Sequence, residues 1–223
     1  MKPTPAKKPR RPVDEALWAS RCEQILDAAA ALFARYGYAD TDTQLLAEKL
    51  GVGKGTLYRY FPSKRALFLA AADRVMRRLH DCIEESIKDV TDPLDQVAEA
   101  IRTYLAFFAE HPDFVELLMQ ERAQFKDRKE STYFQHRAAN IERWRALWRT
   151  LITQGRVRDM PVERITDVLG GLVYGTMFTN YFTGPRKSVK DQAQDILDVV
   201  FHGILTDAGR QGGRKAHGPR PLD

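Results

Sequence analysis

TDTQLLAEKLGVGKGTLYRYFPSKRALF, residues 41–68, predicts two short helices joined by a glycine turn and the start of a longer third helix. Thr41 and Gln44 have the spacing of a capping box, in which two side chains satisfy free N–H groups at a helix start. Leu45 and Leu46 begin the apolar face of the first helix. Gly51 occupies the position at which many helices end in a left-handed conformation.

The second short helix is predicted from about residue 54 to residue 60. Leu57 and Phe61 are four residues apart and therefore face the same side, which we assign to the interior. Pro62 ends this helix and Ser63 caps the next one. Two helices with this connection are typical of a helix-turn-helix, whose second helix can lie in a DNA major groove.

The region from residue 37 to residue 68 resembles the DNA-binding signature of the TetR/AcrR family of bacterial regulators. The sequence departs from that signature at Gly53, where a capping Ser is usual, and at Asp42, where Ser or Thr is common. The matching positions are Gly37, Tyr38, Thr41, Ala47, Gly51, Val52, Gly55, Thr56, Leu57, Tyr58, Tyr60, Phe61 and Lys64.

The resemblance implies that this region contacts a double-stranded DNA operator. We expect Tyr58, Lys64 and Lys54 to contact phosphates or groove edges, and Thr56, Gly55 and Gln44 to lie closest to the bases. The full set of expected DNA-contact residues is Thr41, Thr43, Gln44, Lys54, Gly55, Thr56, Tyr58, Tyr60 and Lys64.

Positive charge is concentrated in the same region. Residues 43–65 contain five basic side chains and one acidic side chain, and residues 1–11 contain five basic side chains and no acidic one. A basic patch on a helix-turn-helix is the electrostatic pattern expected of a DNA-binding surface. For the Pro-rich arm, 1–12, contact with phosphates or a minor groove and a merely disordered terminus are both open.

The composition and motifs exclude several other classes of protein. No apolar run approaches the length of a membrane span, and the basic N-terminus is not followed by the apolar segment of a secretory signal. Cys22 and Cys82 form no metal-binding or disulfide pattern, so we expect a cytoplasmic protein with reduced thiols. The five histidines are dispersed and no catalytic or phosphate-binding motif is present, so we predict no enzyme activity, no cofactor and no metal.

Apolar residues recur with helical spacing along the chain, and no segment alternates like a strand, so the predicted fold is all-α with about nine helices. Outside the helix-turn-helix, helices are expected near residues 14–36, 63–89, 93–110, 114–119, 130–154, 161–182 and 189–207. The predicted organisation is a flexible arm (1–12), a helix-turn-helix domain (13–68), a ligand-binding and dimerisation domain (69–208) and a disordered tail (209–223).

The last two helices are candidates for a homodimer interface, because they combine apolar faces with Gly170, Gly171 and Gly175. Glycine inside a helix costs about 1 kcal/mol relative to alanine, so three of them suggest close helix contact. The alternative is that these faces form the core of a single chain. The resemblance implies a four-helix bundle with the partner's helices, with interface residues Leu169, Leu172, Val173, Met177, Leu197, Val200 and Ile204.

Aromatic side chains are dense in residues 104–148 and 174–182, with polar groups between them, which is typical of a small-molecule site between helices. Aromatic residues of an ordinary core would give the same pattern. This half of the chain also resembles the AefR-like subgroup of the family. The predicted pocket residues are Tyr104, Phe108, Leu118, Glu121, Phe134, Trp144, Trp148, Tyr174 and Phe178.

These observations lead to two hypotheses. The first is a dimeric repressor that a small hydrophobic or aromatic ligand releases from a palindromic operator, by shifting the helix that begins after Ser63. The second is a DNA-binding factor without a small-molecule effector, which is constitutive or controlled by a protein. An activator is a further alternative to the repressor.

Overall fold

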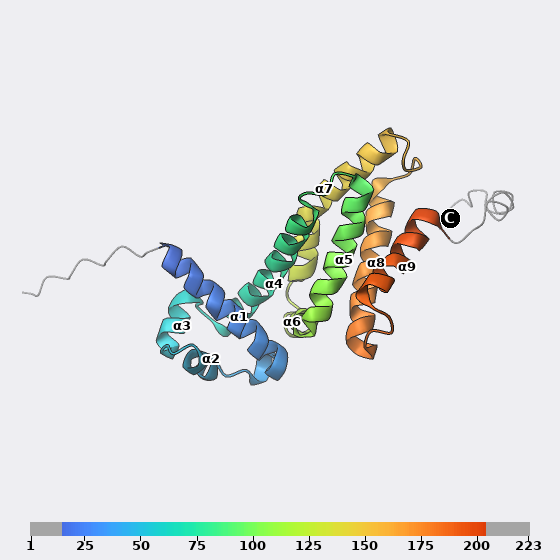
Figure 1. Cartoon of the computed structure of the whole chain (residues 1–223). Coiled ribbons are helices and arrows are strands. Elements are labelled where there is room, and N and C mark those ends of the chain that lie inside the picture. Colours follow the sequence, from blue (N-terminus) through green and yellow to red (C-terminus); the bar gives the residue numbers. More distant parts are fainter. Residues whose placement is uncertain (1–14, 204–223) are drawn as a thin grey trace, which may run out of the picture. The chain divides into compact units, whose positions relative to one another are not determined.

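The computed structural model describes residues 15–203, and these residues form nine α-helices and no strand. The prediction of an all-α fold is therefore confirmed. The predicted tail and Ile204 lie outside the described residues, as does the arm. The helices are α1 (Glu15–Asp40), α2 (Thr43–Lys49), α3 (Lys54–Tyr60), α4 (Lys64–Ile87), α5 (Pro93–Glu110), α6 (Pro112–Gln124), α7 (Thr132–Thr153), α8 (Val162–Thr183) and α9 (Val189–His202) (Figure 1).

Local sequence signals account for several helix ends. Gly51 has a φ of 63°, a conformation that a side chain disfavours, and it follows Leu50, the C-cap of α2. Asp92 accepts hydrogen bonds from the N–H groups of Leu94 and Asp95, and Pro93 occupies the first position of α5. Both were predicted from the sequence. In α1 the helical geometry is broken at Gly37, where φ is 78°.

The contacts between helices define two compact units. Unit 1 contains the described residues up to Arg78 together with Asp113–Ala138, and unit 2 contains Leu79–Pro112 together with the described residues from Ala139 onward. Helices α4 and α7 each contribute residues to both units. The predicted boundary between residues 68 and 69 stays a prediction.

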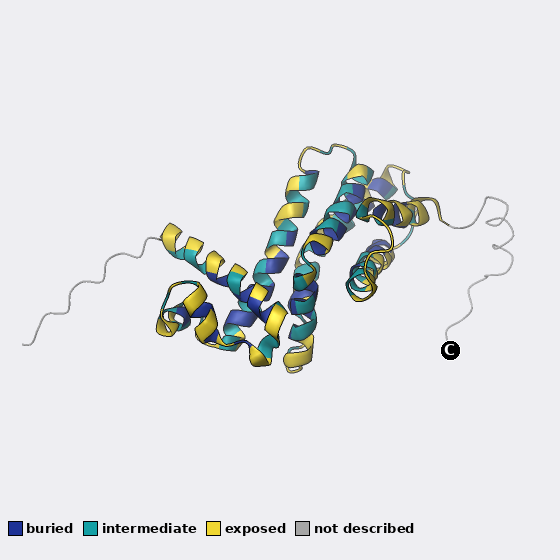
Figure 2. Ribbon diagram, turned by 60° about the horizontal axis from the view of Figure 1, so that its bottom comes forward, coloured by how far each residue is buried: buried dark blue, intermediate teal, exposed yellow. Residues whose placement is uncertain are grey.

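The core of unit 1 joins α1 to the helix-turn-helix and to α6. Leu46 and Leu57, from α2 and α3, are completely buried. Four aromatic rings lie in edge contact or stacked on one another around Phe68, with centroids 4.9–6.1 Å apart: Phe33, Tyr38, Phe68 and Phe125. Buried and exposed bands alternate along α1 (Figure 2), so one side of α1 forms this core. Burial of such rings contributes a large share of the stability of a small unit.

Unit 2 is organised around α5, which packs against α8 and α9 (Figure 1). Ile101 and Leu105 of α5 are buried, as are Leu151 of α7 and Met177 of α8. The hydroxyl of Tyr104 donates to the sulfur of Met177 at 3.4 Å, which gives this buried phenol a partner. Among the described helices, none is both long and apolar enough to cross a membrane.

Candidate DNA-binding site

Helix α2 begins one residue later than the capping-box prediction required. Asp42 is the N-cap, and its carboxylate accepts the N–H of Gln44 at 2.8 Å. The hydroxyl of Thr41 instead donates to the carbonyl oxygens of Gly37 (2.6 Å) and Leu32 (3.3 Å), and Thr41 is buried. The prediction that Thr41 caps α2 is wrong, because its hydroxyl is used to fix the connection from α1.

A hydrogen bond between α2 and α3 joins two residues that the sequence placed at the DNA. The hydroxyls of Thr43 and Tyr58 are 3.0 Å apart, and Thr43 is buried while Tyr58 is half-buried. This bond sets the orientation of Tyr58 on α3, the second helix of the helix-turn-helix, which we call the recognition helix. Thr41 and Thr43 therefore support the site from within, and their side chains are not part of its exposed face.

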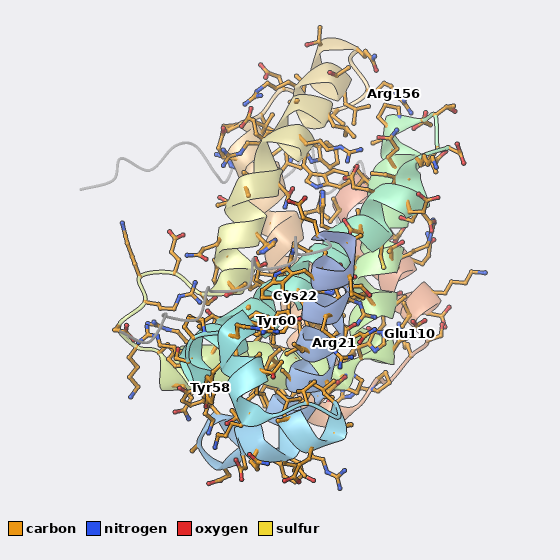
Figure 3. All side chains as sticks on the ribbon, turned by 90° about the vertical axis from the view of Figure 1, so that its left-hand side faces the viewer. Arg21, Cys22, Tyr58, Tyr60, Glu110 and Arg156 are labelled. Atoms are coloured by element: carbon orange, nitrogen blue, oxygen red, sulfur yellow. The ribbon has the colours of Figure 1, made fainter. Side chains whose placement is uncertain are left out.

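Tyr60 packs against α1. Its ring stacks on Trp18 with a centroid distance of 3.9 Å and an angle of 23° between the planes. Figure 3 shows Tyr60 and Tyr58 on different sides of α3. Tyr60 lies towards α1, where Arg21 and Cys22 are labelled, whereas Tyr58 lies on the outer side. Tyr60 therefore fixes the end of the recognition helix, and this stacking was not readable from sequence spacing.

The exposed face of the helix-turn-helix carries Gln44, Lys54 and Gly55. The amide of Gln44 donates to the carboxylate of Glu48 at 2.9 Å, so its carbonyl oxygen remains as an acceptor. Lys54 lies 3.9 Å from the carboxylate of Asp42, and both side chains are about half exposed or more. Such an exposed pair contributes little to stability, so the ammonium group of Lys54 remains accessible to a partner.

Nothing in residues 15–203 requires a glycine at position 55. A Cβ added at this position meets no heavy atom within 4 Å, and the backbone is helical. An alanine would stabilise the helix by about 1 kcal/mol. A glycine is explained if a partner surface, such as that of DNA, approaches the backbone closely at this position, because a side chain would then block the approach.

The start of α4 completes the site. The hydroxyl of Ser63 accepts the N–H of Ala66 at 3.0 Å, as the predicted cap requires. Lys64 donates to the carbonyl of Ala39 at 2.8 Å, and its ammonium group lies 5.1 Å from the centroid of the Tyr38 ring. The hydrogen bond to Ala39 uses one of the three donors of the Lys64 ammonium group, which lies near the positive end of the α4 dipole.

The nine predicted pocket residues belong to both units, and their role in a pocket stays a prediction. Unit 1 contains Leu118, Glu121 and Phe134, whereas unit 2 contains Tyr104, Phe108, Trp144, Trp148, Tyr174 and Phe178. Within unit 2, Tyr104 contacts Phe108 and Tyr174 contacts Phe178, with centroids 5.1 and 4.7 Å apart. Burial raises the pKa of Tyr174. Phe134, in contrast, is 43% exposed.

Glu121 is buried inside unit 1, and the sequence did not indicate that its carboxylate stabilises the fold. It is 1% exposed, forms an ion pair with Arg128 and accepts the N–H of Thr132 at 2.9 Å through Oε1. Its other oxygen is buried without a hydrogen-bond partner. The observed role of this carboxylate is therefore to hold the connection between α6 and α7.

The predicted interface residues divide by exposure. Leu169, Met177 and Leu197 are buried within the chain, Val173 and Val200 are half-buried, and Leu172 is 37% exposed. The most exposed apolar side chains on α8 and α9 are Val168, Leu172, Phe182, Val199 and Phe201. Gly171 and Gly175 lie in open space, since an added Cβ at either meets nothing within 4 Å.

Two family models match the chain. The model described as "Bacterial regulatory proteins, tetR family" matches residues 25–71, and the model described as "Tetracyclin repressor-like, C-terminal domain" matches residues 90–204. The chain belongs to the tetR family. The first match contains α2, α3 and the beginning of α4, which supports the resemblance inferred from the sequence. The AefR-like subgroup stays a prediction.

The curated relatives are named transcriptional regulators and nucleoid occlusion factors. The "Uncharacterized HTH-type transcriptional regulator YerO" of Bacillus subtilis is 26% identical over 73% of this chain and 56% of its own length. "Nucleoid occlusion factor SlmA" of Actinobacillus pleuropneumoniae is 30% identical over 54% of this chain and 58% of its own length. The chain thus spans about half the length of the curated relatives it matches.

Solved structures share the fold. The fatty acid degradation regulator FadR of Bacillus halodurans superposes with a TM-score of 0.68 and 16% identity, over 82% of this chain and 99% of that one. FadR of B. subtilis in complex with stearoyl-CoA has a TM-score of 0.68 and 19% identity, over 82% and 98%. At this level of identity the two likenesses show a shared fold.

Proposed function

We propose that this protein is a transcriptional regulator that binds a palindromic operator as a homodimer and is released by a small, largely apolar ligand. The observation that supports DNA binding most directly is the exposed face of α2 and α3. Gln44 and Lys54 lie on that face, and no contact among the described residues explains a glycine at position 55. A helix-turn-helix with these properties fits a major groove.

Thr56 and Lys64 have different roles in this proposal. Thr56 is half-buried on the recognition helix, where its methyl group can contact a thymine methyl. Lys64 contacts a phosphate, which carries no sequence information. Replacing Thr56 should therefore change which sequences bind, whereas replacing Lys64 should weaken all sequences to the same degree.

The dimer is proposed to form through the exposed apolar side chains of α8 and α9. Val168, Leu172 and Val199 are 56%, 37% and 48% exposed, which is unusual for three large apolar side chains on one pair of helices. Gly171 and Gly175 would allow a partner helix to approach closely. A two-fold dimer places two recognition helices about 34–36 Å apart, the spacing of successive major grooves.

The effector proposal is supported by the aromatic side chains of α5 and α8 in unit 2 and by the ligand of one structural neighbour. FadR of B. subtilis, whose fold is similar, was solved with stearoyl-CoA. An apolar effector that binds unit 2 would bias the position of α4, because α4 contributes residues to both units. The ligand must bind one of two states more tightly to shift their populations.

The test is a selection of bound sequences from random DNA, followed by fluorescence anisotropy with the selected site. Thr56→Ala should relax the preference at one base position, and Lys64→Ala should lower the slope of log K against log salt by about 1. Lys190→Ala, which removes an exposed charge from α9, is the matched control. Unchanged profiles for both site variants would refute the assignment.

A second candidate is a DNA-binding factor without a small-molecule effector. Relatives named nucleoid occlusion factors, rather than transcriptional regulators, favour it. Fatty acyl-CoA and aromatic acid libraries distinguish the two candidates. At a hundredfold excess over Kd, an effector would stabilise the protein by about 2.7 kcal/mol and release the selected DNA. The second candidate predicts neither effect with any compound.

A further inference from the structure

The connection between α6 and α7, residues 125–131 (FKDRKES), lies in unit 1 with the helix-turn-helix. Nothing in the family signature at residues 37–68 involves this segment. We name it the 125–131 loop. Its first residue, Phe125, is 4% exposed, and its ring contacts Tyr38 and Phe68 with centroids 4.9 and 5.4 Å apart. The loop is therefore packed into the core that supports the DNA-binding helices.

A charged contact attaches the loop to the first turn of α4. Arg65 pairs with Asp127 at 2.5 Å, and the guanidinium group of Arg65 lies 4.9 Å from the centroid of the Phe125 ring. Arg65 follows Lys64, the residue proposed to bind a phosphate. The loop consequently lies beside the N-terminal end of α4, where the helix dipole also favours an anion.

The middle and the far end of the loop are fixed by Glu121, which pairs with Arg128 and accepts the N–H of Thr132. Arg128 bonds to Glu121 and donates to the hydroxyl of Thr132 at 3.0 Å and to the amide oxygen of Gln135 at 2.9 Å. Phe125 at its start, Arg128 in its middle and Thr132 directly after it thus hold a short connection. Side chains between them have a defined starting position, which reduces the entropy lost when they bind.

Two lysines of the loop take part in neither of its two ion pairs. Asp127 is paired with Arg65 and Arg128 with Glu121, whereas Lys126 and Lys129 are exposed and form no ion pair within residues 15–203. Glu130 is also exposed and subtracts one charge. Figure 3 shows the loop to the left of α3, on the side on which Tyr58 is labelled. The two lysines are therefore exposed positive charges on a loop that is attached to the first turn of α4.

We propose that Lys126 and Lys129 form a second phosphate-binding site, which contacts the DNA backbone next to the phosphate bound by Lys64. This inference rests on the proposed function, since it requires that α3 and the start of α4 bind duplex DNA. The partner is the phosphodiester backbone, which carries one charge per about 1.7 Å of duplex. The site adds affinity and length to the footprint but no base preference.

The test is the double variant Lys126→Gln/Lys129→Gln, measured on the selected DNA site at salt concentrations between about 0.1 and 1 M. Two lost phosphate contacts should lower the slope of log K against log salt by about 1.8 and weaken binding at least tenfold at 0.1 M. The Kd values of variant and wild type should converge at 1 M salt. The selected sequence should not change.

The control is Lys88→Gln/Lys190→Gln, which removes the same charge from exposed positions of unit 2. Equal binding curves for the two double variants would overturn the inference, because the effect would then be one of net charge alone. If Lys64→Ala still weakens binding in that case, the proposed function stands. If the wild-type chain selects no DNA, the proposed function fails, and this inference fails with it.

Discussion

Replacing Glu121 tests whether its carboxylate has the structural role described above. Glu121→Ala leaves the buried N–H of Thr132 without an acceptor, which costs about 1–3 kcal/mol. Removing one member of a buried ion pair costs about 3–5 kcal/mol, but Arg128 is 18% exposed and keeps two other acceptors, so the lower end applies. We therefore expect a loss of about 3 kcal/mol in the free energy of unfolding.

For a chain of this length, that loss corresponds to a decrease in Tm of about 6–12 °C. Glu121→Gln retains an acceptor for Thr132 and should cost about 1 kcal/mol. Urea unfolding and thermal melts, compared at one protein concentration, measure both variants, and Gln124→Ala at the exposed end of α6 is the control. A Tm of Glu121→Ala equal to that of the wild type would refute the reasoning. A Glu121→Ala variant that loses its response to ligand but keeps its stability would also refute it.

Three further variants test individual contacts. The hydrogen bond from Arg65 holds the pKa of Asp127 below its ordinary value of 3.8. The pair between Asp127 and Arg65 therefore stabilises the fold above pH 3.8, and this stabilisation is lost as the pH falls through the lower pKa of the folded state. The urea midpoint of Asp127→Asn should consequently differ from wild type more at pH 7 than at pH 3, and an equal difference would contradict the pairing. Gly55→Ala should stabilise the protein by about 0.5–1 kcal/mol, because no neighbour among the described residues opposes a Cβ, and it should weaken DNA binding if DNA approaches the backbone there. Leu172→Glu should dissociate the proposed dimer in sedimentation experiments, whereas Glu163→Ala on the exposed surface of α8 should not, and a dimeric Leu172→Glu would exclude this interface.

The helices and most of their ends were predictable, because the signals are local. Gly51 and the Asp92–Pro93 pair determine backbone geometry at their own positions, so each is visible in the sequence. Thr41 shows where local signals fail. Thr41 and Asp42 are both good capping residues. Asp42 caps α2 because the hydroxyl of Thr41 donates instead to carbonyl groups of α1.

The roles of individual site residues depended on contacts between distant segments. Tyr60 has the spacing of an exposed residue of the recognition helix, yet Trp18 of α1 covers it. Glu121 lies among aromatic residues in the sequence, and only the fold places it beside Arg128 and Thr132. Spacing along one helix cannot indicate which surface another helix covers.

The most direct test of the central claim is footprinting of the wild-type protein on its selected DNA site. A two-fold dimer with one recognition helix per half-site predicts two inverted half-sites, with centres about 10–10.5 base pairs apart or a multiple of that distance. Protection should disappear with Leu172→Glu at protein concentrations that saturate the wild-type complex. A single unrepeated site, or equal protection by the Leu172→Glu variant, would contradict the proposal of a dimeric operator-binding regulator.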